Sequence, residues 1–170
     1  DILGRYVLAF TLRRDGSDKF FDNQKYNWFP SASAAWKISE ENFLKNVNWI
    51  NLLKLRASWG ITGSDNLGSS LYGTYSATEF RASFDGNASQ YTPYALSSSN
   101  AYWVSWQKTM MSNIGLDFYF LGNRLYGSVD VFRNDVTRLL GTDATAPLAM
   151  FEMKKVNYGH YYRHGWEVNL

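Results

Sequence analysis

The sequence has 170 residues, enough for one domain with a sizeable core, and its formal net charge of +2 comes from 17 basic and 15 acidic residues spread along the chain. No basic run is long enough to neutralise a row of phosphates, which argues against nucleic-acid binding, and the absence of cysteine excludes disulfides, thiolate metal sites and a cysteine nucleophile. Aromatic residues make up 18% of the chain, which is typical either of a membrane–water interface or of a carbohydrate-binding surface.

The apolar residues follow a period of two along almost the whole chain, which predicts strands with one apolar face. No apolar run reaches the roughly 18–20 residues that a transmembrane helix requires. Residues 1–5 lack the charged and apolar regions of a signal peptide, so we expect any targeting signal to lie outside this sequence.

The first two predicted strands cover residues 6–13 and 28–38, with a polar loop at 15–27 between them. The first strand places on one face Tyr6, Leu8, Phe10 and Leu12. The second places on one face Trp28, Pro30, Ala32, Ala34, Trp36 and Ile38. Small and polar residues alternate with these, as expected of a sheet that separates lipid from a water-filled lumen.

Residues 39–52 predict a short helical connection with Ser39 as N-cap. A third strand over 53–61 follows, in which one face carries Leu53, Leu55, Ala57, Trp59 and Ile61. The opposite face carries Lys54, Arg56, Ser58 and Gly60. Two cations at alternate positions indicate that this second face is in contact with water.

Residues 62–103 are rich in Gly, Ser, Asn, Thr and Tyr and predict a long loop. A fourth strand is predicted over 106–121, a tight hairpin turn at Gly122-Asn123, and a fifth strand over 124–140. A second loop over 141–160 leads to a last strand, whose apolar-side positions are Tyr162, His164, Trp166, Val168 and Leu170.

The fold class predicted is therefore all-β, an antiparallel meander of about six strands. In lipid, an open sheet would leave edge backbone groups without hydrogen-bond partners, and bacterial membrane barrels have about eight strands or more. We therefore expect residues 1–170 to be one part of a larger closed barrel.

Several motifs resemble one family in its order and spacing. They are Arg13-Arg14-Asp15-Gly16-Ser17, Phe29-Pro30-Ser31, residues 35–44, residues 53–63, Gly115-Leu116-Asp117-Phe118, Asn123-Arg124-Leu125, Asn157-Tyr158-Gly159 and Gly165-Trp166-Glu167. Together they resemble the barrel of SusC/RagA-type TonB-dependent transporters, over most of the chain outside residues 66–105.

The resemblance implies an outer-membrane, multi-pass barrel of about 22 strands in a Bacteroidetes-type bacterium. It also implies a nutrient importer for oligosaccharides or peptides that pairs with a SusD-like surface lipoprotein and draws energy from TonB. The plug domain that contacts TonB and the C-terminal strands are expected to lie outside this chain. The loops at 15–27, 62–103 and 141–160 would face outward, and 39–52 and 122–123 would face the periplasm.

Two groups of residues are candidates for a site. The polar positions predicted to face the lumen are Lys54, Arg56, Asp117 and Glu167, and Asp130 lies on a polar strand face with them. These residues could pair across the lumen or contact the plug, with simple solvation as the alternative. The aromatic residues predicted to contact a ligand from the outer loops are Tyr91, Tyr94, Tyr102 and Trp103. Packing of the loop on itself, or anchoring at the membrane boundary, is the more ordinary role for any one of these aromatics.

No catalytic residue, metal site or cofactor is predicted. His160 and His164 lack the further ligands or the strained serine that a zinc or hydrolase site needs, which argues against an outer-membrane lipase. Asp15, Asp18 and Asp22 do not have the spacing of a calcium loop. The rival from another class is a soluble β-sandwich that binds carbohydrate, in which Leu55, Trp59 and Leu116 would be buried between two sheets.

Overall fold

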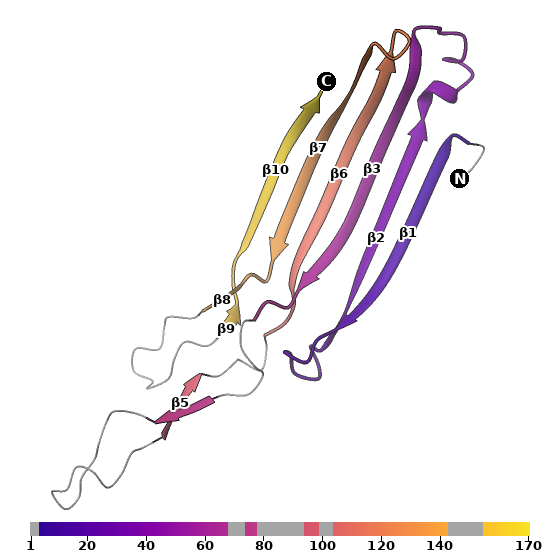
Figure 1. Cartoon of the computed structure of the whole chain (residues 1–170). Helices are drawn as coiled ribbons and strands as arrows, with labels where there is room; N and C mark the ends of the chain where they lie inside the picture. The colour runs from indigo at the N-terminus through magenta and orange to yellow at the C-terminus, as the bar shows by residue number, and fades with distance from the viewer. Residues whose placement is uncertain (1–3, 68–73, 78–93, 99–103, 143–154) are drawn as a thin grey trace, which may run out of the picture.

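The structure, a computed structural model, describes residues 4–67, 74–77, 94–98, 104–142 and 155–170. Six long strands form one antiparallel sheet in the order β1-β2-β3-β6-β7-β10, drawn side by side in Figure 1. They are β1 (Tyr6–Gly16), β2 (Tyr26–Lys37), β3 (Ile50–Ser64), β6 (Gln107–Phe120), β7 (Leu125–Thr137) and β10 (His160–Asn169). The predicted all-β antiparallel meander is confirmed.

Shorter elements lie in the connections. β4 (Thr74–Ala77) pairs with β5 (Tyr94–Ser98), and β8 (Leu140–Thr142) pairs with β9 (Lys155–Asn157). A single 3-10 turn, η1 (Ile38–Glu40), follows β2. Within the residues described, no helix has the length and the apolar composition that crossing a bilayer would take.

One face of the large sheet, the apolar face, carries the side chains that the alternation placed together. Ala57 lies opposite Ile114, Ile114 opposite Val131, and Val131 opposite Trp166, so one apolar row crosses four strands. These side chains are open: Ile114 is 60% exposed and Trp166 73% exposed. An antiparallel sheet in water normally covers its apolar face, so this sheet is built for an apolar environment.

The β-sandwich alternative required burial of this face, and the structure contradicts it. Leu55 is 36% exposed and Trp59 is 40% exposed, and Leu116 is only partly buried. In the described part of the chain, no second sheet packs on these residues.

The opposite face, the polar face, is made of small and hydrophilic side chains. Ser33 lies opposite Ser58, which lies opposite Asn113, and Ser31 lies opposite Gly60. Because these side chains are small, they leave space above the sheet. The larger charged residues can therefore reach their neighbours on adjacent strands.

The connections differ at the two ends of the sheet (Figure 1). At one end, here named the loop end, the strands are joined by residues 17–25, 65–106 and 138–159. At the other, named the turn end, they are joined by residues 38–49 and 121–124. The β6–β7 turn is therefore longer than the predicted Gly122-Asn123 pair, because the last paired residues are Phe120 and Leu125. Leu121 and Asn123 both adopt positive φ, which a four-residue turn requires here.

Three further boundaries differ from the sequence prediction. Ser39 does not cap a helix: it lies inside η1, whose N-cap is Lys37, and its buried hydroxyl has no hydrogen-bond partner. β3 begins at Ile50 rather than near residue 53, with an irregular register between Ile50 and Leu52. β7 ends at Thr137, before Arg138 adopts a φ of 56°, so β8 is a separate strand.

A small apolar core, which the sequence analysis did not predict, lies at the loop end. It consists of Phe20, Phe29, Leu67, Val104 and Trp106, each 5% exposed or less. The ring centroid of Trp106 lies 5.6 Å from that of Phe29 and 5.1 Å from that of Phe20. A Cβ at residue 63 would collide with Phe29 and lie 3.0 Å from Trp106, so Gly63 is what lets these rings pack there. The core joins the start of each loop to the sheet.

Candidate functional site

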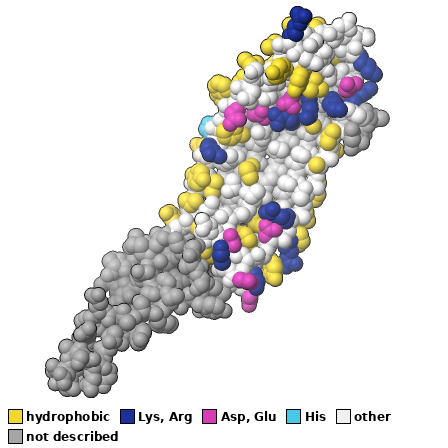
Figure 2. Space-filling view, viewed as in Figure 1, with side chains coloured by type: hydrophobic (Ala, Val, Ile, Leu, Met, Phe, Trp, Pro, Cys, Tyr) yellow, Lys and Arg dark blue, Asp and Glu magenta, His cyan; other side chains and the backbone are white. Residues whose placement is uncertain are grey.

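A row of charged side chains crosses the polar face near its turn end, visible as the band of blue and magenta in the upper half of Figure 2. The structure brings together four of the residues that the sequence analysis singled out. They are Lys54 and Arg56 from β3, Asp117 from β6 and Asp130 from β7. Strand alternation places all four on one face, and the register places them at neighbouring positions.

Arg56 is the centre of this row. Its Nε donates to Asp117 Oδ1 at 3.0 Å, and its Nη2 donates to both carboxylate oxygens of Asp130 at 3.0 Å. Gly115 lies between them in the register, and a Cβ there would collide with the Asp130 carboxylate and lie 2.9 Å from the Arg56 guanidinium. The missing side chain therefore opens the path by which Arg56 reaches across β6 to β7.

The remaining charges in this row are less constrained. Lys54 Nζ is 3.7 Å from Asp117 Oδ2, at the outer limit of an ion pair. Glu167 from β10 is exposed and lies opposite Asp130, a carboxylate against a carboxylate. Like charges in directly opposed positions repel, and the bond from Arg56 to Asp130 offsets this repulsion.

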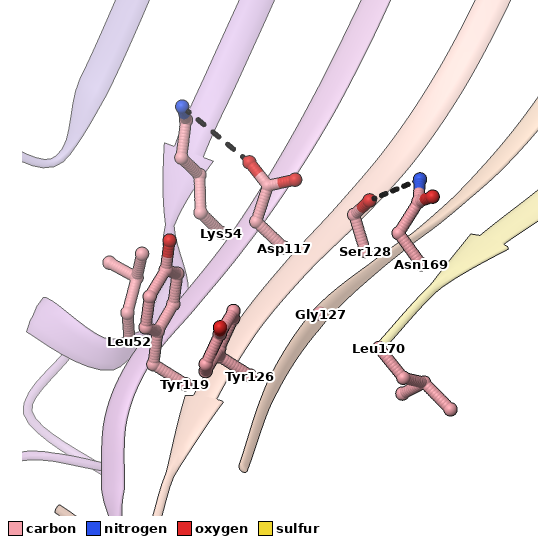
Figure 3. Close-up of a pocket in the computed structure, with 9 residues that line it drawn as sticks. All are labelled: Leu52, Lys54, Asp117, Tyr119, Tyr126, Gly127, Ser128, Asn169 and Leu170. Atoms are coloured by element: carbon pink, nitrogen blue, oxygen red, sulfur yellow. Dashed lines mark hydrogen bonds and ion pairs between the residues drawn. The ribbon is translucent and has the colours of Figure 1, made fainter. Parts of the chain in front are cut away.

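Beside this row, a shallow depression opens toward the turn end (Figure 3). Its floor holds Tyr119 and Tyr126, whose rings stack with centroids 5.8 Å apart. The rim is polar, with the Lys54–Asp117 pair on one side and the Asn169–Ser128 hydrogen bond of 3.4 Å on the other. A stacked tyrosine pair with amide, hydroxyl and charged groups around it is a surface that polar solutes can contact.

At the loop end, a carboxylate joins two connections that are far apart in sequence. Asp65, just after β3, accepts a hydrogen bond of 2.8 Å from the Ser17 hydroxyl and lies 3.4 Å from Lys19 Nζ. The Ser17 hydrogen bond and, secondarily, the Lys19 charge hold the pKa of Asp65 below its usual value. The loop after β1 is thus tied to the loop after β3.

The third connection is tied to the second by Asn157, in β9. Its Oδ1 accepts from the Ser105 backbone N–H at 2.6 Å, and its Nδ2 donates at 2.8 Å to the carbonyls of Ser105 and Arg138. Trp106 Nε1 in turn donates to the Gln24 carbonyl at 3.1 Å. All three connections at the loop end therefore start from one hydrogen-bonded base.

A second convergent carboxylate, Glu41, lies at the turn end. Its Oε1 accepts from the Tyr6 hydroxyl at 2.6 Å and from Trp36 Nε1 at 3.0 Å, while its Oε2 pairs with Arg5 at 3.1 Å. These hydrogen bonds, that of Tyr6 first, lower the pKa of Glu41. Nothing local in the sequence indicates that β1, β2 and the residue before β1 bring three donors to Glu41.

The other sequence candidates do not form a site. Asp15 pairs with Arg13 and Asp18 with Lys25, so these two aspartates are engaged by separate cations. His160 lies 3.8 Å from Asp135, and no group of residues that would suit a metal ion occurs in the described ranges.

The four loop aromatics predicted to contact a ligand remain a prediction. Tyr91, Tyr102 and Trp103 lie outside the described residues, and of Tyr94 the structure describes only the backbone, in β5.

Comparison with known proteins places this geometry among membrane receptors. A family model described as "TonB dependent receptor-like, beta-barrel" matches residues 1–170. TonB-dependent receptor SusC of Bacteroides thetaiotaomicron is 37% identical over 167 residues, covering 93% of this chain and 17% of SusC. TonB-dependent receptor P39 of Formosa agariphila is 34% identical over 171 residues, covering 100% of this chain and 16% of P39. The chain thus spans about a sixth of the length of these curated relatives.

Solved structures show the same fold. The RagAB peptide importer in its closed-closed state superposes with a TM-score of 0.81 at 23% identity, covering 96% of this chain and 17% of that one. The siderophore receptor PirA of Pseudomonas aeruginosa superposes with a TM-score of 0.62 at 16% identity, covering 99% of this chain and 28% of that one.

The geometry of the charged row predicts unequal coupling within it. In a double-mutant cycle of Arg56→Gln and Asp130→Asn, we expect a coupling of about 1 kcal/mol, since the contact is bidentate but the arginine is partly open to water. The cycle of Lys54→Gln and Asp117→Asn should give a coupling near zero because the pair is long. Free energies of unfolding from urea titrations measure both, and equal couplings would contradict the assigned geometry.

The lowered pKa of Asp65 predicts a pH dependence. An ordinary aspartate titrates near pH 3.9, so the contribution of Asp65 to stability is complete above about pH 4 and is lost as the pH falls through its lower folded-state pKa. Asp65→Asn should remove this part of the acid sensitivity, and Ser17→Ala should reduce it. The measurement is the difference in unfolding free energy between wild type and variant from pH 6 to pH 2, and a difference that grows toward low pH would contradict the assignment.

Proposed function

The chain belongs to the TonB-dependent receptor β-barrel family, and from this premise we propose that it forms a stretch of wall in an outer-membrane nutrient importer. The observation that carries the proposal is the contrast between the two faces of one sheet. The apolar face would contact lipid, and the polar face, with Lys54, Arg56, Asp117 and Glu167, would line the interior of the barrel.

The dimensions of the apolar face support a membrane span. On β1, the outward positions from Tyr6 to Arg14 cover roughly 27 Å at ~3.4 Å per residue. Strands of membrane barrels are inclined by about 35–45°, which reduces this length to roughly 20 Å along the membrane normal, close to the ≈ 25 Å apolar band of such barrels. Between these two positions, Leu8, Phe10 and Leu12 are each more than half exposed.

The sheet also has two edges to complete. In the described residues, β1 and β10 each pair with a strand on one side only. Unpaired backbone groups in hydrocarbon cost several kcal/mol each, so we propose that further strands continue the sheet on both sides into a closed barrel of about 22 strands. The plug domain and the remaining strands belong, in this proposal, to polypeptide outside residues 1–170.

The two ends of the sheet support an orientation. Outer-membrane barrels have long extracellular loops and short periplasmic turns, so the loop end would face outward and the turn end inward. The base formed by Asp65, Asn157 and the small apolar core would then hold the outer loops in fixed positions around the entrance. The loop aromatics Tyr91, Tyr94, Tyr102 and Trp103 are proposed to meet the ligand or the partner there.

The proposal extends to partners and substrate. RagAB is a peptide importer, and SusC is a relative with 37% sequence identity. By extension, we propose import of an oligosaccharide or a peptide with a SusD-like lipoprotein and with energy from TonB. The family is one of receptors and transporters, not a class of enzymes, which agrees with the absence of any predicted catalytic residue.

Opposite faces of β3 predict opposite sensitivities to charge. Leu55→Arg puts a cation on the apolar face and should cost roughly 2–4 kcal/mol if it lies near the membrane midplane, impairing assembly of the complete transporter. Ser58→Arg puts the same side chain on the polar face and should leave assembly intact. Heat-modifiable mobility of outer-membrane fractions on SDS gels measures assembly, and equal losses in both variants would refute the assignment of the faces.

Uptake assays test the transport role. A strain that lacks the transporter gene is offered fluorescent oligosaccharides and fluorescent peptides, and we expect it to import neither. The wild-type gene should restore uptake of one of these two kinds of substrate. The Ser58→Arg gene should also restore uptake, whereas removal of TonB should abolish it. Uptake that persists without the gene, or without TonB, would contradict the proposal.

A further inference from the structure

The apolar face ends in cations at the loop end. Its positions from Tyr6 to Leu12 on β1 and from Leu125 to Val131 on β7 carry no charged residue. The next positions on this face are Arg14 on β1 and Arg133 on β7. In a membrane, these guanidinium groups would lie where hydrocarbon gives way to headgroups.

Arg14 is positioned by aromatic rings. Its guanidinium carbon lies 4.6 Å from the centre of the Tyr26 ring and 5.6 Å from that of Trp28. Gly16 contributes, since a Cβ there would lie 2.6 Å from the Tyr26 ring. Stacking uses the faces of the guanidinium and leaves its N–H groups, at the edge, for other acceptors. In the described part of the chain, no carboxylate pairs with Arg14.

Arg133 lies on the same face of the sheet but in a different environment. Its Nε and Nη2 donate to the two oxygens of Asp135 at 2.9 and 3.0 Å, and it lies over the Tyr162 ring at 5.3 Å. Asp135 is almost buried beneath it. An arginine binds a phosphate through two N–H groups at once. At Arg133 two such groups already bind Asp135, whereas at Arg14 no described carboxylate engages them.

We propose that Arg14, with Tyr26 and Trp28, is a binding site for the phosphate of an anionic lipid in the outer leaflet. The inference rests on the membrane orientation given under the proposed function and adds a specific lipid contact to it. Arg14 binds the phosphate through its edge N–H groups, while the acyl chains lie along Leu12 and Phe10, which are 53% and 70% exposed on the same strand. Arg14 is a cation with no carboxylate partner among the described residues, and it lies beside an exposed apolar strip. This combination matches an amphiphile rather than a free phosphate ion.

The test uses the complete transporter, purified in detergent and freed of lipid. Native mass spectrometry follows its titration with a phosphorylated acyl-glucosamine lipid (lipid A) and with the same lipid after removal of its phosphates. We expect the wild type to prefer the phosphorylated lipid by about tenfold, the scale of one charge-assisted bidentate contact. Arg14→Gln should abolish this preference, and Arg133→Gln, the matched control, should change it less than about threefold.

Other outcomes overturn the inference. A preference that survives Arg14→Gln, or equal binding of both lipids by the wild type, would place the phosphate elsewhere. Displacement of the lipid by millimolar inorganic phosphate would indicate a site for the free ion. Arg14→Lys keeps the charge without the planar fork and should show a reduced preference, which provides a second variant if Arg14→Gln assembles poorly. A protein that is monodisperse without detergent would instead refute the proposed function itself.

Discussion

The strict alternation of side chains along antiparallel strands is the constraint on which the rest of this structure depends. The register of each strand pair aligns the apolar positions of one strand with the apolar positions of the next. The polar positions are aligned in the same way. A slip of one residue in any pair would exchange the two faces. The row through Ala57, Ile114, Val131 and Trp166 therefore depends on pairings made over the whole length of the chain.

The apolar face that this alternation creates is not covered by a second layer of protein in the described residues. A folded domain in water gains most of its stability by covering such a surface, and this sheet leaves Phe10, Ile114 and Trp166 open. Family membership and the fold shared with the RagAB importer agree with a lipid environment for these side chains. What stabilises the sheet by itself is the backbone ladder, supplemented on the polar face by Arg56 and its two aspartates.

The two ends of the sheet are organised by different means. At the turn end, Glu41 gathers donors from β1, β2 and the residue before β1, so a single carboxylate fixes how the chain enters and leaves two strands. At the loop end, a small apolar core and the hydrogen bonds of Asp65 and Asn157 join three connections. The described ends of these three connections are therefore held to the sheet and to one another.

The sequence by itself determined the six long strands and their facing, because period-two patterning reports directly which side chains share a face. The family was indicated separately, by the resemblance of several motifs in their order along the chain. Lys54, Arg56, Asp117 and Asp130 could be assigned to polar strand faces in this way, although not the contacts by which Arg56 joins Asp117 to Asp130. Residues 39–52 and the turn at 121–124 were assigned with wrong boundaries, since short connections are set by the strands that they join. Only the tertiary structure decided the contacts of Glu41 and Asn157, the core around Phe29 and Trp106, and the stacking of Arg14. These contacts join residues distant in sequence, and no local pattern encodes which of them the register brings together.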